Sequence, residues 1–354
     1  MGSSALVGKR SGQKAEPADV IKAADVALQT LREHKARAAE DLMSLKRRYA
    51  TQCRSYYSIA ALSRRRHLED EFRSAAMSRL FRLRSTLERA IISDLECCGL
   101  RDDLLKIWSA PSFFGVSAKQ GVSVRYALAS CLPTRQCGAG CYSHDGRDRE
   151  LHHIFRGALN LFIGESYANL SAEEQDELFA RLAPAISYGV ASAREDQQSA
   201  AIQGFVRPPR IRLSHIGEMA ATPHFTNRLA REIRSVDAEI MCVIYTRHPG
   251  ARELDSELLV INFTLEGDHD ARRAWIPPRS RIVASAWNGD LCSVAEVNFL
   301  EHHVEKVQMP VGAGNVCPVT VSHRVTPSCD SAICDLCFRW PAPKNAAALR
   351  VRVS

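Results

Sequence analysis

The hydrophobic pattern of the chain is helical up to about residue 110. No glycine or proline interrupts the segment 19–98, and its apolar residues recur every three or four positions. One such run comprises Leu28, Leu31, Ala38, Leu42, Leu45 and Tyr49, and another comprises Leu68, Phe72, Ala75, Leu83, Leu87 and Ile91. This spacing predicts long helices that form an antiparallel hairpin within residues 17–110.

Beyond residue 110 the pattern alternates between strand-like and helix-like segments. Apolar or alternating runs predict strands at 122–130, 210–215, 240–246, 258–264, 281–286 and 306–311. The segments between or after them predict helices at 150–164, 173–193, 223–236, 268–275 and 292–303, and Ser171 with Glu174 forms a capping-box pattern. Such alternation indicates an α/β fold with a parallel sheet. About six units are visible, so a partial (β/α) barrel over 111–316 is the first interpretation and an open doubly wound sheet the second.

Size and composition are those of an ordinary soluble protein. The chain has 354 residues, of which 45% are hydrophobic and 25% charged. No apolar run approaches the roughly 20 residues that span a bilayer, and the first thirty residues lack the order of a secretory signal. We therefore expect a cytoplasmic protein without a membrane partner. Residues 1–16 and 343–354 are expected to be tails, the first of them disordered.

The positive charge belongs to the helical segment. Of 47 Lys and Arg and 40 Asp and Glu, residues 1–110 hold 21 and 14, a net charge of +7, and the remainder holds 26 of each. Two basic clusters, Lys46 to Arg48 and Arg64 to Arg66, lie on the predicted helices. This basic helical arm could contact nucleic acid or a protein partner, or it could simply present solvated helix faces.

Twelve cysteines in a reducing compartment favour metal or cluster binding over disulfides. Cys131, Cys137 and Cys141 lie in a Gly- and Pro-containing loop after the first predicted strand of the barrel. Three thiols are one short of a closed site. Either His144 completes a structural zinc site, or the fourth position stays open for a substrate or cofactor.

A second cysteine group follows the last predicted strand. Four thiols lie within the segment 317–342, at Cys317, Cys329, Cys334 and Cys337. Such a set predicts a tetrahedral zinc or a cubane iron–sulfur cluster. The remaining cysteines are interpreted as small buried hydrophobes, namely Cys53, Cys97, Cys98, Cys242 and Cys292.

Polar residues at the carboxyl ends of the predicted strands are candidates for ligand binding. Gly217 and Glu218 end the strand that follows the thiol loop, where a glycine would let the backbone approach a ligand and a carboxylate could accept its hydrogen bonds. Tyr245 and Arg247 end the next strand and could bind an anionic or planar ligand. Further polar residues occupy equivalent positions, namely His248, Asn262, Thr264, Ser285 and Asn288. The pairs His152–His153 and His302–His303 are interpreted as surface or satisfied histidines.

Several of these pieces, in this order, resemble the phage "gene product 88" family, whose members belong to phages and mobile elements. The resemblance rests on Cys131, Cys137, Cys141 and Tyr142, on Gly217-Glu218 and Tyr245-Thr246-Arg247, and on Val316-Cys317-Pro318 with Cys329, Cys334, Cys337 and Phe338. It covers roughly residues 120 to 340. The family usually has Ser-Gly-Asp where this chain has Ile216-Gly217-Glu218.

The chain is also distantly similar to radical S-adenosylmethionine enzymes. That resemblance implies a partial barrel, a three-cysteine loop that binds a [4Fe–4S] cluster with one open iron, and S-adenosylmethionine as cofactor. The spacing of Cys137 and Cys141 begins like their motif, but His144 stands in place of its third cysteine and Cys131 lies upstream. The sequence is thus compatible with three interpretations. The first is an iron–sulfur protein with an open cluster, and the second is a zinc-stabilised module that binds nucleic acid or protein. The third is a scaffold protein of a mobile element.

Overall fold

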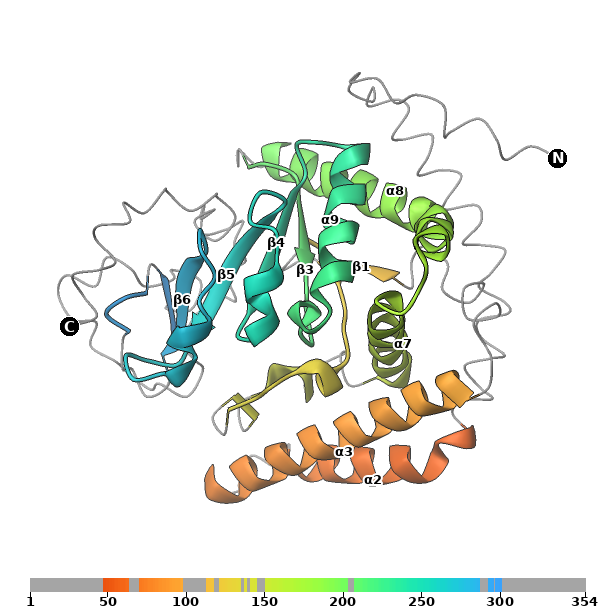
Figure 1. The fold of residues 1–354 in the computed structure, drawn as a ribbon. Helices are drawn as coiled ribbons and strands as arrows, with labels where there is room; N and C mark the ends of the chain where they lie inside the picture. The colour runs from red at the N-terminus through yellow and green to blue at the C-terminus, as the bar shows by residue number, and fades with distance from the viewer. Residues whose placement is uncertain are drawn as a thin grey trace.

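The computed structural model describes residues 47–63, 70–97, 113–117, 121–134, 137–138, 141–144, 150–202, 207–286, 292–295 and 297–300 (Figure 1). Both predicted tails, the segment 17–46 of the arm, the predicted strand at 306–311 and the whole C-terminal cysteine group lie outside these ranges. Within them, no helix is long and apolar enough to cross a membrane.

The core of the fold is one sheet of seven strands arranged in sequence order. The strands are β1 (Phe114–Ser117), β2 (Gly121–Val124), β3 (Arg210–Leu213), β4 (Met241–Thr246), β5 (Leu259–Leu265), β6 (Arg281–Ala286) and β7 (Val297–Leu300). β1 pairs with β2 in the antiparallel sense, and every later pair is parallel. The predicted α/β class with a mostly parallel sheet is therefore confirmed. A doubly wound sheet requires a switch point at which the strand order reverses. The order of the described strands contains no such reversal.

The register gives the sheet one apolar and one polar face. Ile211 of β3 pairs with Cys242 of β4 and with Val122 of β2, and all three side chains are buried. Their neighbours in each strand belong to the opposite face, because side chains alternate along a strand. That face carries polar residues in adjacent strands, including Arg212, Tyr245, Asn262 and Arg281.

Helices cover the apolar face. The connection between β2 and β3 contains α7 (Leu151–Tyr167) and α8 (Ala172–Ile202), and α9 (Pro223–Val236) joins β3 to β4. α9 begins with a proline in its first turn and buries Phe225, Leu229 and Ile233, which share one side of a helix at a spacing of four. The predicted helices at 150–164, 173–193 and 223–236 are confirmed. So is the capping box at Ser171, whose backbone N–H donates to Glu174 and whose hydroxyl accepts from the Glu174 N–H.

Some local predictions were wrong. The segment predicted as a helix at 292–303 contains β7, since Val297 and Phe299 alternate with other residues and pair beside β6. The predicted strand 122–130 ends at Val124 and is followed by the 3-10 turn η1 (Leu128–Ser130). The predicted helix 268–275 is only the short 3-10 turn η6 (Ala271–Trp275). Similar turns, η4 (Met219–Ala221) and η5 (Pro249–Glu253), follow β3 and β4. β1 was not predicted at all.

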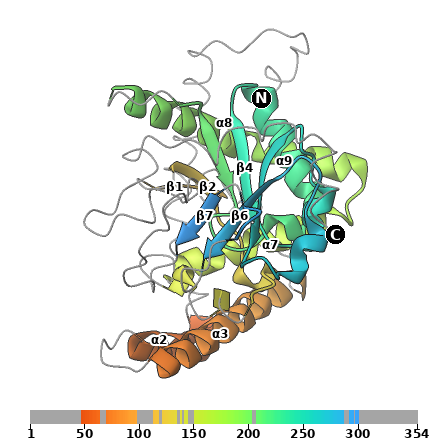
Figure 2. The ribbon, with the colours of Figure 1, turned by 90° about the vertical axis from the view of Figure 1, so that its left-hand side faces the viewer.

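The basic arm is present as two packed helices, α2 (Ala50–Ser63) and α3 (Asp70–Cys97). Both views place this pair beneath the sheet (Figures 1 and 2). α3 packs against α7, against η1 and against the turn η2 (Tyr142–His144). The arm therefore contacts the segments that flank the three-cysteine loop.

Candidate functional site

The three-cysteine loop starts directly after η1, at the end of β2. Cys131 follows this turn, and its backbone N–H donates to the carbonyl of Leu128 at 2.9 Å. Cys141 precedes η2, and its sulfur lies 2.9 Å from the hydroxyl of Ser143. No disulfide joins the cysteines of the described residues. The loop thus presents its thiols at the carboxyl ends of the strands, as its position after β2 predicts.

The structure brings the three thiols together with two predicted partners. Burial raises the pKa of Cys131 well above its usual value, and the Glu218 carboxylate and the thiols of Cys141 and Cys137 raise it further. Burial also raises the pKa of Cys137 to about 11, against an opposing effect of the Arg247 guanidinium. These groups are therefore close enough for their charges to act on one another.

The separation of the sulfur atoms bears on what they could hold. The three thiol sulfurs do not all lie within 4.8 Å of one another. Thiolates on a single tetrahedral zinc would lie about 3.8 Å apart, given a Zn–S bond of about 2.3 Å. A cubane cluster places each thiolate on a different iron and so requires a wider spacing. At least one pair of these sulfurs is therefore farther apart than two thiolates on a single zinc ion.

Glu218 is buried and held from three sides. Its backbone N–H donates to the hydroxyl of Ser130 at 2.8 Å, next to Cys131. Its carboxylate accepts a hydrogen bond of 2.7 Å from the Thr246 hydroxyl and one of 3.4 Å from the backbone N–H of Arg247. Burial raises the pKa of this carboxyl despite these bonds. The residue therefore joins the ends of β3 and β4 to the start of the thiol loop.

Arg247 links the site to the next strand. Its guanidinium donates to Glu266, at the end of β5, over 2.7 Å. Glu266 also accepts a hydrogen bond from the hydroxyl of Thr134, whose oxygen in turn accepts the backbone N–H of Cys137 at 3.1 Å. This chain of contacts fixes the middle of the thiol loop against the strand ends. Glu266 and Thr134 were not identified from the sequence, because only the parallel register brings them to Arg247.

Gly217 lies at the site for a different reason from the one the sequence indicates. Its φ of +75° is in the left-handed region that favours glycine. A Cβ at this position would lie 2.5 Å from the carbonyl oxygen of Ala127. The space in front of Gly217 is therefore taken by the chain that leads into the thiol loop, and the glycine allows two segments of the protein to approach each other.

Tyr245 faces the polar side of the sheet. The guanidinium carbon of Arg212 lies 4.6 Å from the centre of its ring, in a cation–π arrangement. On the same face, Arg281 donates to the amide oxygen of Asn262 at 3.3 Å. The face that carries Tyr245 is thus rich in arginine, which suits an anionic ligand more than a cationic one.

The helical arm closes the other side of the loop. Glu88 and Arg84 of α3 form a fully buried ion pair at 2.9 Å. Glu88 accepts the backbone N–H of Ala129, and Arg84 donates to the carbonyl of Ser143, each at 2.9 Å. Nothing in the local sequence marks these two residues, because both belong to a helix that the loop meets only in the folded protein.

His144 belongs to this contact with the arm. It is 3% exposed, and its Nδ1 lies 3.2 Å from the hydroxyl of Tyr56 in α2. The ring of Phe81 packs edge-on against it. Burial, and then the charge of Arg84, lower the pKa of His144 to about 3. In the described part of the chain, His144 does not form a ligand group with two of the thiols whose donor atoms all lie within 4.8 Å. Its contacts with the arm give no support to a role as the fourth ligand of the loop.

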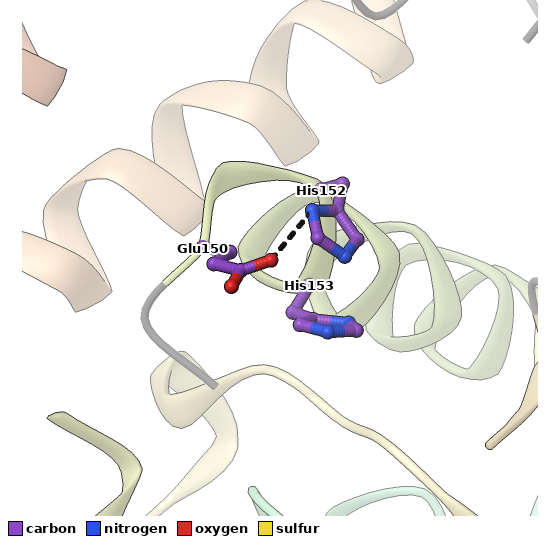
Figure 3. Close-up of side chains that lie close together, drawn as sticks. All are labelled: Glu150, His152 and His153. Carbon is purple, nitrogen blue, oxygen red and sulfur yellow. Dashed lines mark ion pairs between the residues drawn. The ribbon is translucent and has the colours of Figure 1, made fainter. Parts of the chain in front are cut away.

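A different group of metal-ligating side chains is more compact. Glu150, His152 and His153, at the start of α7, each present a donor atom within 4.8 Å of the other two (Figure 3). From the sequence alone, this histidine pair is interpreted as surface or satisfied residues. Elsewhere in the described ranges, no other group of three such residues meets this distance.

Comparison with known proteins adds no relative. No protein-family model matches the chain, and neither the curated proteins nor the solved structures contain a significant match.

Proposed function

We propose that this chain is an iron–sulfur protein, similar to radical S-adenosylmethionine enzymes, in which Cys131, Cys137 and Cys141 bind a [4Fe–4S] cluster. The observation that carries the proposal is the convergence of three partly buried thiols with Glu218 and Arg247 at the carboxyl ends of parallel strands. Three protein thiolates leave one iron of such a cluster for another ligand. When bound, the cluster supplies one-electron chemistry.

The roles of the protein groups follow from their contacts. The Glu218 carboxylate, oriented by Thr246 and by the backbone of Arg247, is suited to accept hydrogen bonds from an amino or hydroxyl group of the ligand. The Arg247 guanidinium is suited to an anionic group, with Glu266 fixing its direction. S-adenosylmethionine carries both an amino and a carboxylate group and is the cofactor that the resemblance implies.

The proposed architecture around this site is a partial (β/α) barrel. Six consecutive parallel strands, β2 to β7, in sequence order support it, because a barrel adds strands in one direction. In the same proposal, Cys317, Cys329, Cys334 and Cys337 hold a second cluster or a zinc ion. A phage or mobile-element origin and a cytoplasmic location belong to this proposal as well.

The test is the colour and metal content of protein purified without oxygen. An iron–sulfur protein should be brown, absorb near about 400 nm and contain iron and sulfide. Replacing Cys131, Cys137 and Cys141 by serine should remove about four irons per chain. The matched control, Cys242→Ser, alters a buried cysteine of β4 away from the loop and should keep them. Colourless protein with stoichiometric zinc would overturn the proposal.

A zinc-stabilised module that binds nucleic acid is the second candidate. The observation that favours it is the charge of the arm, where Arg54, Arg79 and Arg82 are exposed on α2 and α3. In that case the cysteines are structural and the arm carries the function.

A further inference from the structure

The start of α7 has an unusual arrangement of three ligating side chains. Glu150 stands at the residue before the helix, but its carboxylate makes no capping hydrogen bond. It turns instead toward His152, with 3.5 Å between its Oε2 and the histidine Nδ1 (Figure 3). The ring of His153 lies beside that of His152, with 3.8 Å between their centres. Three residues within four positions therefore bring their donor atoms within 4.8 Å of one another.

The donor separations are close to those of a metal site. A zinc ion bound at about 2.0 to 2.2 Å would hold its nitrogen and oxygen ligands about 3.3 to 3.6 Å apart. The Glu150–His152 pair already has this separation. The third donor lies within 4.8 Å of both. Small side-chain rotations would close the set, because the side chains of Glu150 and His152 are 49% and 40% exposed.

The surroundings leave room for ligands other than protein. Glu150 and His152 line a cavity of about 780 Å³ between α2 and the start of α7, together with Arg54, Tyr57 and Ser58. Two histidines and one carboxylate leave at least one coordination position of zinc open. Water or an anion entering from this cavity could occupy it. A closed structural site would have no such access.

We propose that Glu150, His152 and His153 form a binding site for a divalent transition-metal ion, with zinc as the expected occupant. The two imidazoles suit zinc, nickel and copper, whereas magnesium and calcium prefer sites built from oxygen ligands alone. The site is independent of the thiol loop and of the iron–sulfur proposal, since it contains no cysteine.

Metal binding at this site would also affect the packing of the arm. The Tyr57 hydroxyl of α2 is hydrogen-bonded to the backbone of Leu151, the residue between Glu150 and His152. Metal binding would order the turn that this bond uses. An ion that binds only the folded protein stabilises it, and the gain grows with the logarithm of the ion concentration once this exceeds Kd. Zinc should therefore stabilise the packing of the arm against α7.

The experiment compares zinc bound per chain in full-length proteins at the same buffered free zinc. The double variant His152→Ala/His153→Ala should bind one equivalent less than the wild type. The matched control His224→Ala alters a histidine that is 72% exposed and lies 3.9 Å from Glu253. This pair has no third ligating side chain within 4.8 Å in the described part of the chain, so the control should lose no zinc. Equal zinc in the double variant and the wild type would overturn the site.

A second measurement separates this site from thiol-bound metal. Protein loaded with cadmium-113 should give one NMR resonance in the range of nitrogen and oxygen ligands, and the double variant should lack it. Glu150→Gln, which keeps both histidines and the shape of the side chain, should weaken zinc binding at least about tenfold. This single variant also serves if the double variant fails to fold. A resonance in the sulfur-ligand range alone would overturn the proposal.

Discussion

The buried guanidinium of Arg84 donates a hydrogen bond of 2.9 Å to the carbonyl of Ser143, two residues after the last thiol of the loop. Four residues along the same helix, Glu88 accepts the backbone N–H of Ala129, two residues before the first thiol. One ion pair of α3 thus holds both ends of the three-cysteine loop. The arm is consequently part of the environment of the thiols, whatever else it binds.

The buried pair makes the fold sensitive to the loss of one partner. Arg84→Met should lower the free energy of unfolding by about 3 to 5 kcal/mol, because it leaves the carboxylate of Glu88 buried without its counter-ion. Arg84→Met/Glu88→Leu should be less destabilised than the single variant, since no charge is then left uncompensated. Chemical denaturation of both variants measures these values.

The exposed pair of the same helix is the control. Arg89 lies 2.9 Å from Glu165, with side-chain exposures of 49% and 35%, and makes one further exposed hydrogen bond of 3.2 Å to the Ala129 carbonyl. Solvent screens this pair, so Arg89→Met should cost less than about 1 kcal/mol. Equal losses for Arg84→Met and Arg89→Met would show that the buried pair does not hold the loop.

Gly217 should tolerate no side chain. Gly217→Ala places a Cβ 2.5 Å from the Ala127 carbonyl at a φ of +75°, so we expect a loss of about 2 to 4 kcal/mol in the free energy of unfolding. Gly115→Ala is the control, because its Cβ would meet only the Ser123 carbonyl at an ordinary 3.8 Å. Thermal unfolding compares the two. A Gly217→Ala protein as stable as the Gly115→Ala protein would contradict the close approach.

The parallel sheet was predictable because its signals are local. The apolar runs at β4, β5 and β6 and the spacing of Phe225, Leu229 and Ile233 in α9 each specify an element without reference to the rest of the chain. β7 was missed because its four residues follow a stretch with a helix-like pattern. Its strand form depends on pairing with β6, a contact that no local window contains.

The candidate site was predictable only for residues that follow the parallel strands directly. Cys131, Glu218 and Arg247 follow successive parallel strands, so their meeting at one edge follows from the sheet itself. Arg84 and Glu88 come from a helix before the sheet, and their contact with the loop is set by tertiary packing. The role of Gly217 was misread for a related reason, since the sequence shows that a backbone approaches but not which one.

His144 should make the protein less stable in acid. Its pKa is lowered to about 3 in the folded protein by burial and by Arg84, against about 6.5 in the unfolded chain. As the pH falls, the unfolded chain therefore binds a proton at this histidine before the folded protein does. The contribution of neutral His144 to the free energy of unfolding is complete above about pH 6.5 and is lost as the pH falls toward 3. Between pH 7 and pH 5 the loss is about 2 kcal/mol.

The variant His144→Phe isolates this effect. It keeps an aromatic ring beside Tyr56 and Phe81 but cannot titrate. Between pH 7 and pH 5, its free energy of unfolding should therefore fall by about 2 kcal/mol less than that of the wild type. Denaturation at the two pH values measures the difference, even if the variant is less stable at both. A wild-type slope in His144→Phe would contradict the assignment.

The exposed arginines of the arm decide whether it binds nucleic acid. Arg79 and Arg82 of α3 are exposed, while Arg84 of the same helix is buried against the loop. If the exposed pair contacts phosphates, Arg79→Gln/Arg82→Gln should reduce the slope of log affinity against log salt by about two, since each phosphate contact contributes about 0.9. Arg279→Gln, which removes an arginine that is 70% exposed outside the arm, is the control and should keep the slope. Binding of duplex DNA and of RNA, titrated by fluorescence anisotropy at several salt concentrations, gives the slopes. Affinity that is independent of salt, or that falls equally in both variants, would exclude nucleic acid as a partner of these arginines. The contact with the thiol loop would then be the role of the arm that the structure supports.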